Sequence, residues 1–193
     1  MDPVLRATAT AVIDHALGRP PLLGGGRLVC IDGPAGSGKT TLAAAVVGVA
    51  AERVDTVHLI HADDLLTGWG GLPGLGPRLR NYVVGPLASG HPARYRRYDW
   101  ELEAPAEEHV VAPMDLLVLE GCGTGHRALR SRRATLVWVE APESLRLARG
   151  LARDGEAVRG LWLDWMAQEP LVIGTGAQRR DVDLRVDGVG ALV

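Results

Sequence analysis

Short apolar runs alternate along the chain with longer stretches in which apolar side chains recur at helical spacing. The runs are continuous and rich in leucine and β-branched residues, as is typical of parallel strands buried on both faces. They lie at residues 28–31, 57–60, 116–119, 135–139 and 184–186. Each run therefore predicts a buried strand.

The stretches between these runs predict helices. Leu5, Ala9, Val12 and Ala16 follow helical spacing, so we expect a helix over residues 3–17. The other expected helices cover residues 41–51, which are rich in alanine, residues 142–153, which begin with proline and end before a glycine, and residues 158–168.

The segment between the second and third apolar runs is less regular. Residues 67–77 are dense in glycine and proline, which predicts a surface loop without regular structure. Residues 79–88 predict a helix that is kinked at Gly85 and Pro86. Residues 94–100 predict an extended segment.

This alternation predicts an α/β fold, in which a parallel sheet is covered by helices on both faces. The length of 193 residues suits a single domain with a substantial core. In such sheets ligands bind beyond the carboxyl ends of the strands. Residues that directly follow an apolar run are therefore the first candidates for a functional site.

The first apolar run is followed by the phosphate-binding pattern G-x-x-x-x-G-K-[ST]. Its glycines let backbone N–H groups surround phosphate oxygens, its lysine reaches the β- and γ-phosphates, and its hydroxyl binds Mg²⁺. Lys39 is the only lysine among 21 basic residues, so its place in this pattern is informative. The expected ligands are ATP and Mg²⁺, and the expected binding residues are Gly33, Ala35, Gly36, Ser37, Gly38, Lys39, Thr40 and Thr41.

Acidic residues follow two other runs. Glu120 ends the third run, and we expect it to hold Mg²⁺ directly or through water, the alternative being a strand-terminating acid in solvent. Asp63 and Asp64 follow the second run. Phosphoryl transfer to an alcohol needs a carboxylate that orients the hydroxyl and takes its proton, and we expect one of this pair to do so. The alternative is that both residues only cap a turn or a helix.

Three groups of arginines stand out, and the one at Arg130, Arg132 and Arg133 is expected to be surface charge at a helix end. Arg146, Arg149 and Arg153 share one stripe of a helix, where they could close over the transferring phosphoryl group. A solvated basic face is the alternative. The arginines of residues 94–97 alternate with tyrosines, but a formal net charge of −2 argues against a nucleic-acid partner.

Composition narrows the class of protein further. A GTPase reads guanine with an N-K-x-D element, which a chain with one lysine in another motif does not contain. We see no signal peptide and no run of the ~20 apolar residues that a bilayer span needs. The two cysteines lack metal-ligand spacing and suit a reducing compartment. We therefore expect a cytoplasmic protein without a membrane partner.

Five short segments together resemble the uridine kinase family of P-loop kinases. These are residues 33–40, 63–66, 98–100, 119–121 and 153–154, and the resemblance runs from about residue 27 to 187. It implies a P-loop NTPase fold with an arginine-bearing lid. Members of the family usually carry aromatic side chains where this chain has Leu65 and Leu66, and the spacing from Arg149 to Arg153 is one residue longer than expected.

The resemblance also implies roles for individual residues. Asp63 would be the general base, and Lys39 and Thr40 would bind triphosphate and Mg²⁺. Glu120 would be a metal-site acid and Arg153 a lid arginine, so Asp63, Lys39 and Arg153 are the expected catalytic residues. Asp99 would hold ribose hydroxyls, and the wider set of expected substrate contacts is Asp64, Tyr98, Asp99 and Arg149.

The sequence thus predicts an Mg²⁺-dependent ATP phosphotransferase that acts on a hydroxyl of a small molecule, most readily a nucleoside. We expect one domain over residues 1–193, with an N-terminal helix and glycine joint at 1–26, an acceptor-side insertion at 64–100 and a lid at 146–169. Two alternatives are an ATPase switch and a non-catalytic nucleotide-binding protein, either acting with a protein partner. The sequence leaves the acceptor, the choice between ATP and GTP, and the oligomeric state open.

Overall fold

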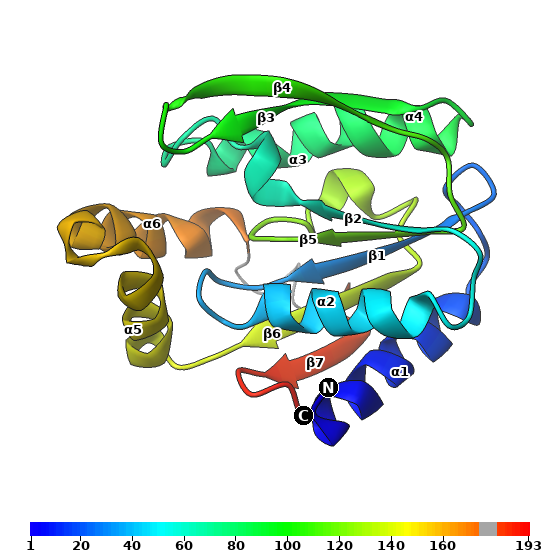
Figure 1. The fold of residues 1–193 in the computed structure, drawn as a ribbon, viewed down its shortest axis with the longest axis horizontal. Coiled ribbons are helices and arrows are strands. Elements are labelled where there is room, and N and C mark those ends of the chain that lie inside the picture. Colours follow the sequence, from blue (N-terminus) through cyan, green and yellow to red (C-terminus); the bar gives the residue numbers. More distant parts are fainter. Residues whose placement is uncertain (174–180) are drawn as a thin grey trace.

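A five-stranded parallel sheet forms the centre of the molecule (Figure 1). The structure is a computed structural model, and it describes residues 1–173 and 181–193. In spatial order the strands are β2 (Val57–His61), β5 (Leu116–Glu120), β1 (Arg27–Asp32), β6 (Thr135–Glu140) and β7 (Leu184–Asp187). All five expected strands are present, and every neighbouring pair is parallel.

Side chains of the strands alternate between two apolar layers, which explains why the strands read as continuous apolar runs. One layer packs under α1 (Pro3–Leu17) and α2 (Lys39–Ala50), which also contact each other. Val29 and Ile31 of β1 belong to this layer, together with Val118 of β5. Both helices were predicted from the sequence, and they cover this face of the sheet.

The other layer is covered by residues 62–88 and by a hairpin. A 3-10 turn at Ala62–Leu65 follows β2, and another lies at Leu72–Gly74. The chain then forms one helical segment made of α3 (Leu75–Arg78), a π-helical stretch (Leu79–Val84) and α4 (Gly85–Ala88). The hairpin joins β3 (Ala93–Asp99) to β4 (Ala104–Val111), which are antiparallel.

Two further helices lie at the carboxyl ends of the sheet strands (Figure 1). They are α5 (Glu143–Asp154) and α6 (Arg159–Val172), joined by a 3-10 turn at Glu156–Val158. A last 3-10 turn lies at Arg127–Leu129. Within the described residues, none of the helices has the length and apolar character to cross a bilayer.

The segment between β2 and β5 differs from the sequence predictions in two respects, the helical structure of residues 72–78 and an additional strand. Residues 72–78 are helical rather than irregular, because Pro73 occupies the first turn of a 3-10 helix, where a missing N–H is tolerated. Residues 79–88 are helical as predicted, and before Pro86 the hydrogen bonds change to the π pattern, which lets the helix continue through this proline. The strand β4 was missed, because the hairpin buries little of it and its sequence lacks a clear alternation of apolar and polar residues.

Candidate active site

The glycine loop between β1 and α2 forms a tight turn at the carboxyl end of the central strand. Gly33 and Gly36 have positive φ angles of 146° and 75°. A β-carbon on Gly33 would overlap the carbonyl oxygen of Val139, and one on Gly36 would lie 2.6 Å from the carbonyl oxygen of Arg146. The loop therefore needs glycine at both positions, for backbone conformation and for space.

The loop has the features of an anion site. Its Ser37 hydroxyl is buried and has no hydrogen-bond partner, so it is available to a ligand. No side chain caps the N-terminus of α2, which leaves backbone N–H groups and the positive end of the helix dipole for an anion. The loop borders a cavity of about 610 Å³, which suits a nucleotide. The residues from Ala35 to Thr41 all line this cavity.

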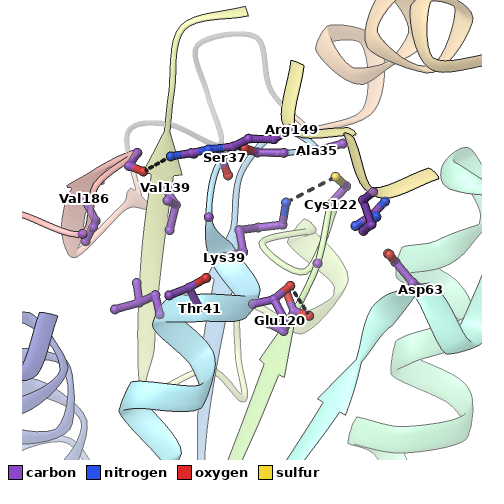
Figure 2. Close-up of a pocket in the computed structure, with 18 of the residues that line it drawn as sticks. Ala35, Ser37, Lys39, Thr41, Asp63, Glu120, Cys122, Val139, Arg149 and Val186 are labelled. Carbon is purple, nitrogen blue, oxygen red and sulfur yellow. Dashed lines mark hydrogen bonds between the residues drawn. The ribbon is translucent and has the colours of Figure 1, made fainter. Parts of the chain in front are cut away.

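Lys39 extends along the loop towards the end of β5 (Figure 2). Its Nζ donates to the carbonyl oxygen of Pro34 at 2.8 Å and lies 3.6 Å from Sγ of Cys122. Burial opposes its charge, but the surrounding acidic groups outweigh burial and raise the pKa of Lys39. The ammonium group is therefore charged and held in the loop before any phosphate binds. The Cys122 thiol, whose pKa burial raises to about 12, remains protonated.

Asp32 fixes the loop to the segment that follows β5. Its carboxylate accepts hydrogen bonds from the backbone N–H groups of Gly33, Gly123 and Gly125, at 2.7, 2.7 and 2.8 Å. Burial raises the pKa of Asp32 to about 6, although these three donors favour the ionised form. One buried carboxylate thus holds together the two loops that border the cavity.

Glu120 lies beside Thr40, as expected of two groups that share a metal ion. The Thr40 hydroxyl donates to Oε1 of Glu120 at 3.2 Å, and Nδ1 of His61 lies 2.6 Å from the same oxygen. The bond to Glu120 raises the pKa of His61. Glu120 is buried, so its carboxylate faces the cavity and these two partners rather than bulk solvent.

Asp63 follows β2 and points into the cavity from the side opposite the glycine loop (Figure 2). Desolvation by the surrounding protein raises the pKa of Asp63. The Glu120 carboxylate raises this pKa further, and the charge of Lys39 lowers it. The side chain is exposed and opens onto the cavity. Asp64 does not line the cavity, so of the two aspartates Asp63 is the one that faces the loop.

The three arginines of α5 occupy different environments. Arg146 is buried and bonded to Glu169. Arg149 donates to the carbonyl oxygens of Gly36 and Gly188, at 3.3 and 2.9 Å, so it joins the loop to the turn after β7. Arg153 lines the cavity and pairs with Asp154. Unlike the other two arginines, Arg153 bonds neither to a carbonyl oxygen of the glycine loop nor to Glu169.

Tryptophans gather at the end of the cavity that contains Asp63, which we term the acceptor end. Trp69, Trp162 and Trp165 line it, and Trp100 of the hairpin packs on Trp69. The ring centroids lie 5.6 to 6.5 Å from that of Trp69, and all three rings are edge-to-face with it. The cluster joins residues 67–71, the hairpin and α6 around the cavity.

Two of the expected substrate contacts lie elsewhere in the hairpin. Asp99 accepts hydrogen bonds from the backbone N–H groups of Glu101 and Leu102 and pairs with Arg97, so it stabilises the β3–β4 turn. Tyr98 packs edge-to-face on Trp100. Neither residue lines the cavity, whereas Arg149 does.

Sequence reasoning did not identify Asp32 or Glu169. The buried Glu169 carboxylate accepts a hydrogen bond from the N–H of Ala35, at 2.6 Å. The available signal was that Glu169 is an acidic residue in a helix that also carries tryptophans. Its partner, Ala35, lies 134 residues away in sequence. Spacing along the chain does not reveal such a contact.

No protein-family model matches the chain, and no curated protein matches it in sequence. Several solved structures do match. A possible uridine kinase from Bacillus stearothermophilus has a TM-score of 0.64 and 20% identity, over 95% of this chain and 99% of that chain. A candidate fructose transport system kinase from Silicibacter sp. has a TM-score of 0.63 and 20% identity, over 89% and 94%.

A D-glycerate 3-kinase from Cryptococcus neoformans matches with a TM-score of 0.64 and 13% identity, over 100% of this chain and 98% of that chain. The chain therefore has the fold of the uridine kinase-like P-loop kinases, which confirms the predicted fold class. At these identities the likeness shows the fold alone, because one fold carries many activities. The three kinases also differ in the small molecules that their names give.

Proposed function

We propose that the chain is an Mg²⁺-dependent phosphotransferase that moves the γ-phosphate of ATP to a hydroxyl group of a small molecule. One observation carries the proposal: a single cavity brings together the glycine loop with Lys39, the Thr40–Glu120 pair, and Asp63 facing them. These groups come from three strand ends, which is where an α/β sheet binds its ligand.

The residues present fit ATP and Mg²⁺. The unpaired Ser37 hydroxyl, the uncapped N-terminus of α2 and the charged Lys39 suit a polyphosphate. Thr40 and Glu120 offer the hard oxygen ligands that Mg²⁺ binds in phosphoryl-transfer sites, together with phosphate oxygens and water. When bound, the ion would neutralise charge on the transferring phosphoryl group.

Positioning is the main contribution of the protein to such a reaction. The loop N–H groups and Lys39 would fix the phosphates, and Asp63 would orient the acceptor hydroxyl and take its proton. Arg153 would offset the charge that develops during transfer. Effective molarities from such orientation are worth about 7–11 kcal/mol in favourable cases.

The acceptor end favours a kinase over a nucleotide-driven switch. A switch needs only a water molecule near the γ-phosphate, whereas here Leu66 and three tryptophans line the same cavity as Asp63 and offer apolar surface to an organic acceptor. We propose a nucleoside as the first acceptor to test, because a flat base suits aromatic walls and a ribose offers a primary hydroxyl. A sugar or another hydroxylated metabolite would fit the same reaction class.

The test is ADP release measured against a panel of nucleosides, nucleotides, sugars and vitamins. We expect at least one acceptor to raise ADP release above the rate with water alone and to yield a phosphorylated product. Asp63→Asn should retain ATP binding and lose turnover by a factor of about 10²–10⁴, the usual contribution of a positioned base. Asp64→Asn is the matched control and should keep most of the turnover.

Two outcomes would contradict the proposal. ADP release that is independent of every acceptor would indicate an ATPase switch, and tight ATP binding without ADP release would indicate a non-catalytic nucleotide-binding protein. Full turnover in Asp63→Asn would remove the assignment of the base.

A further inference from the structure

The backbone of Ala35, in the glycine loop, is held at its N–H and at its carbonyl oxygen by the two helices at the strand ends. Oε1 of Glu169, on α6, accepts a hydrogen bond from the Ala35 N–H at 2.6 Å. Nη1 of Arg146, on α5, donates to the Ala35 carbonyl oxygen at 3.3 Å. The same Nη1 donates to Oε2 of Glu169 at 2.8 Å. The N–H belongs to the Pro34–Ala35 peptide and the carbonyl oxygen to the Ala35–Gly36 peptide, so the two side chains fix two successive peptides of the loop.

The two side chains are buried as a charged pair. Glu169 is 2% exposed and Arg146 is 8% exposed. Glu169 also accepts from the indole Nε1 of Trp165 at 3.0 Å, whereas Nε of Arg146 has no partner. Carboxylate and guanidinium thus balance each other, since burying either charge alone is costly. The reaction proposed above uses neither residue.

The location of this pair creates an electrostatic requirement. A buried carboxylate bonded to a phosphate-binding loop would repel a triphosphate, and a poorly solvated environment strengthens that repulsion. The guanidinium of Arg146 bonds both to this carboxylate and to the Ala35 carbonyl oxygen, so it cancels the negative charge beside the loop. The loop therefore gains a strong hydrogen-bond acceptor for the Ala35 N–H without gaining a net negative charge.

We propose that Glu169 and Arg146 are a positioning pair, which fixes the two peptides on either side of the Ala35 α-carbon and acts on bound triphosphate as one neutral unit. The inference rests on the proposed nucleotide site and adds two residues to it. It also assigns Arg146 to the loop rather than to the transferring phosphoryl group.

The first test is the affinity of each variant for a non-hydrolysable ATP analogue with Mg²⁺, measured by calorimetry. Arg146→Met leaves the Glu169 charge unopposed beside the loop, so we expect the analogue to bind roughly 10-fold or more weakly. Glu169→Gln keeps an oxygen for the Ala35 N–H and adds no negative charge, so its loss should be smaller. The double variant should bind roughly 10-fold more tightly than Arg146→Met alone.

A merely structural ion pair would affect folding stability but not the loop, so every variant that folds would then bind the analogue as the parent chain does. Arg146→Lys is the conservative rescue, because both bonds of Arg146 come from one nitrogen and an ammonium group can replace it. It should restore affinity to within about threefold of the parent chain. The matched control removes the exposed pair Arg6–Glu52 by Arg6→Met and Glu52→Gln and should leave affinity unchanged.

A second test needs no nucleotide. In the free chain, exchange of the Ala35 amide hydrogen with solvent should be at least about 10-fold faster in Glu169→Ala than in the parent chain or in Glu169→Gln. Equal exchange in all three would overturn the proposal, as would a double variant no better than Arg146→Met. If Arg146→Met does not fold, the proposal is tested by the Ala35 exchange rates and by the affinity of Arg146→Lys for the analogue. A parent chain that does not bind the analogue but shows the expected exchange would count against the nucleotide site alone.

Discussion

Asp32 illustrates how one buried carboxylate can hold a loop and make stability depend on pH. Its pKa is about 6 in the folded chain and 3.8 in its ordinary range. The folded state therefore binds this proton more tightly than the unfolded state, and the stability due to Asp32 is greatest below pH ~4 and declines as pH rises through about 6. A difference of about two units between the pKa values of the folded and unfolded states corresponds to about 3 kcal/mol of stability.

We therefore expect the free energy of unfolding of the parent chain to fall, relative to that of Asp32→Asn, between about pH 4 and pH 7. Urea unfolding at several pH values measures it. Asp115 is the control with the opposite sign, because its hydrogen bonds to Thr56 lower its pKa and its contribution is lost as pH falls. A constant difference between Asp32→Asn and the parent chain across this range would contradict the pKa shift.

The same reasoning applied to Asp63 predicts the acid limb of turnover. A general base works only when it is ionised. Desolvation and the nearby Glu120 carboxylate both raise the pKa of Asp63. We therefore expect kcat to fall with decreasing pH at a midpoint above the ~3.9 of an ordinary aspartate. Asp64→Asn should keep this limb. An unchanged limb in the residual activity of Asp63→Asn would assign it to another group.

At the residue scale, the sequence predicted the groups that belong to one short motif or follow a strand. Lys39, Thr40, Glu120 and Asp63 were found in this way, because parallel strands bring their carboxyl ends to the same edge of the sheet. Glu169 was not found, because its position depends on how α6 docks. Docking of that kind depends on packing between elements far apart in sequence.

At the scale of elements, α5 and α6 pack through a glycine. A β-carbon on Gly150 would overlap the ring of Trp162. Overpacking costs about 1–3 kcal/mol, against about 1 kcal/mol gained from the higher helix propensity of alanine. Gly160 has no atom within 4 Å of its added β-carbon, so it offers the matched control on α6.

We accordingly expect Gly150→Ala to be at least about 1 kcal/mol less stable to urea than Gly160→Ala. It should also lower kcat, because displacement of Trp162 moves Arg153, whose guanidinium lies 5.8 Å from that ring. Equal stability and equal kcat for the two variants would show that the interface adapts freely.

The elements differ in how well the sequence predicts them. The sheet strands were found because burial on both faces leaves an unbroken apolar run, as in β5 with its five buried residues. The helical segment from Leu75 to Ala88 was predicted only from residue 79 onwards, because the glycines and prolines of residues 67–77 indicated a loop.

At the scale of the whole molecule, ligand binding should raise the free energy of unfolding and therefore the melting temperature. A ligand that binds only the folded chain stabilises it by about 2.7 kcal/mol at 100 times its Kd, which is about 5–10 °C in Tm for a chain of this size. We expect this rise with Mg²⁺ and ATP. Lys39→Ala is the control. Its Tm should rise much less with Mg²⁺ and ATP, although its circular dichroism spectrum without ligand should match that of the folded parent chain. Equal rises in both proteins would place ATP elsewhere.

The clustering of indole rings around the acceptor end has a practical consequence. Four of the five tryptophans, Trp69, Trp100, Trp162 and Trp165, stand there, and the fifth, Trp138, lies in the sheet. Most of the intrinsic fluorescence therefore originates where an acceptor would bind, and the close spacing lets excitation pass from ring to ring. The molecule carries its own optical probe, and an unlabelled sample is enough to screen for its substrate.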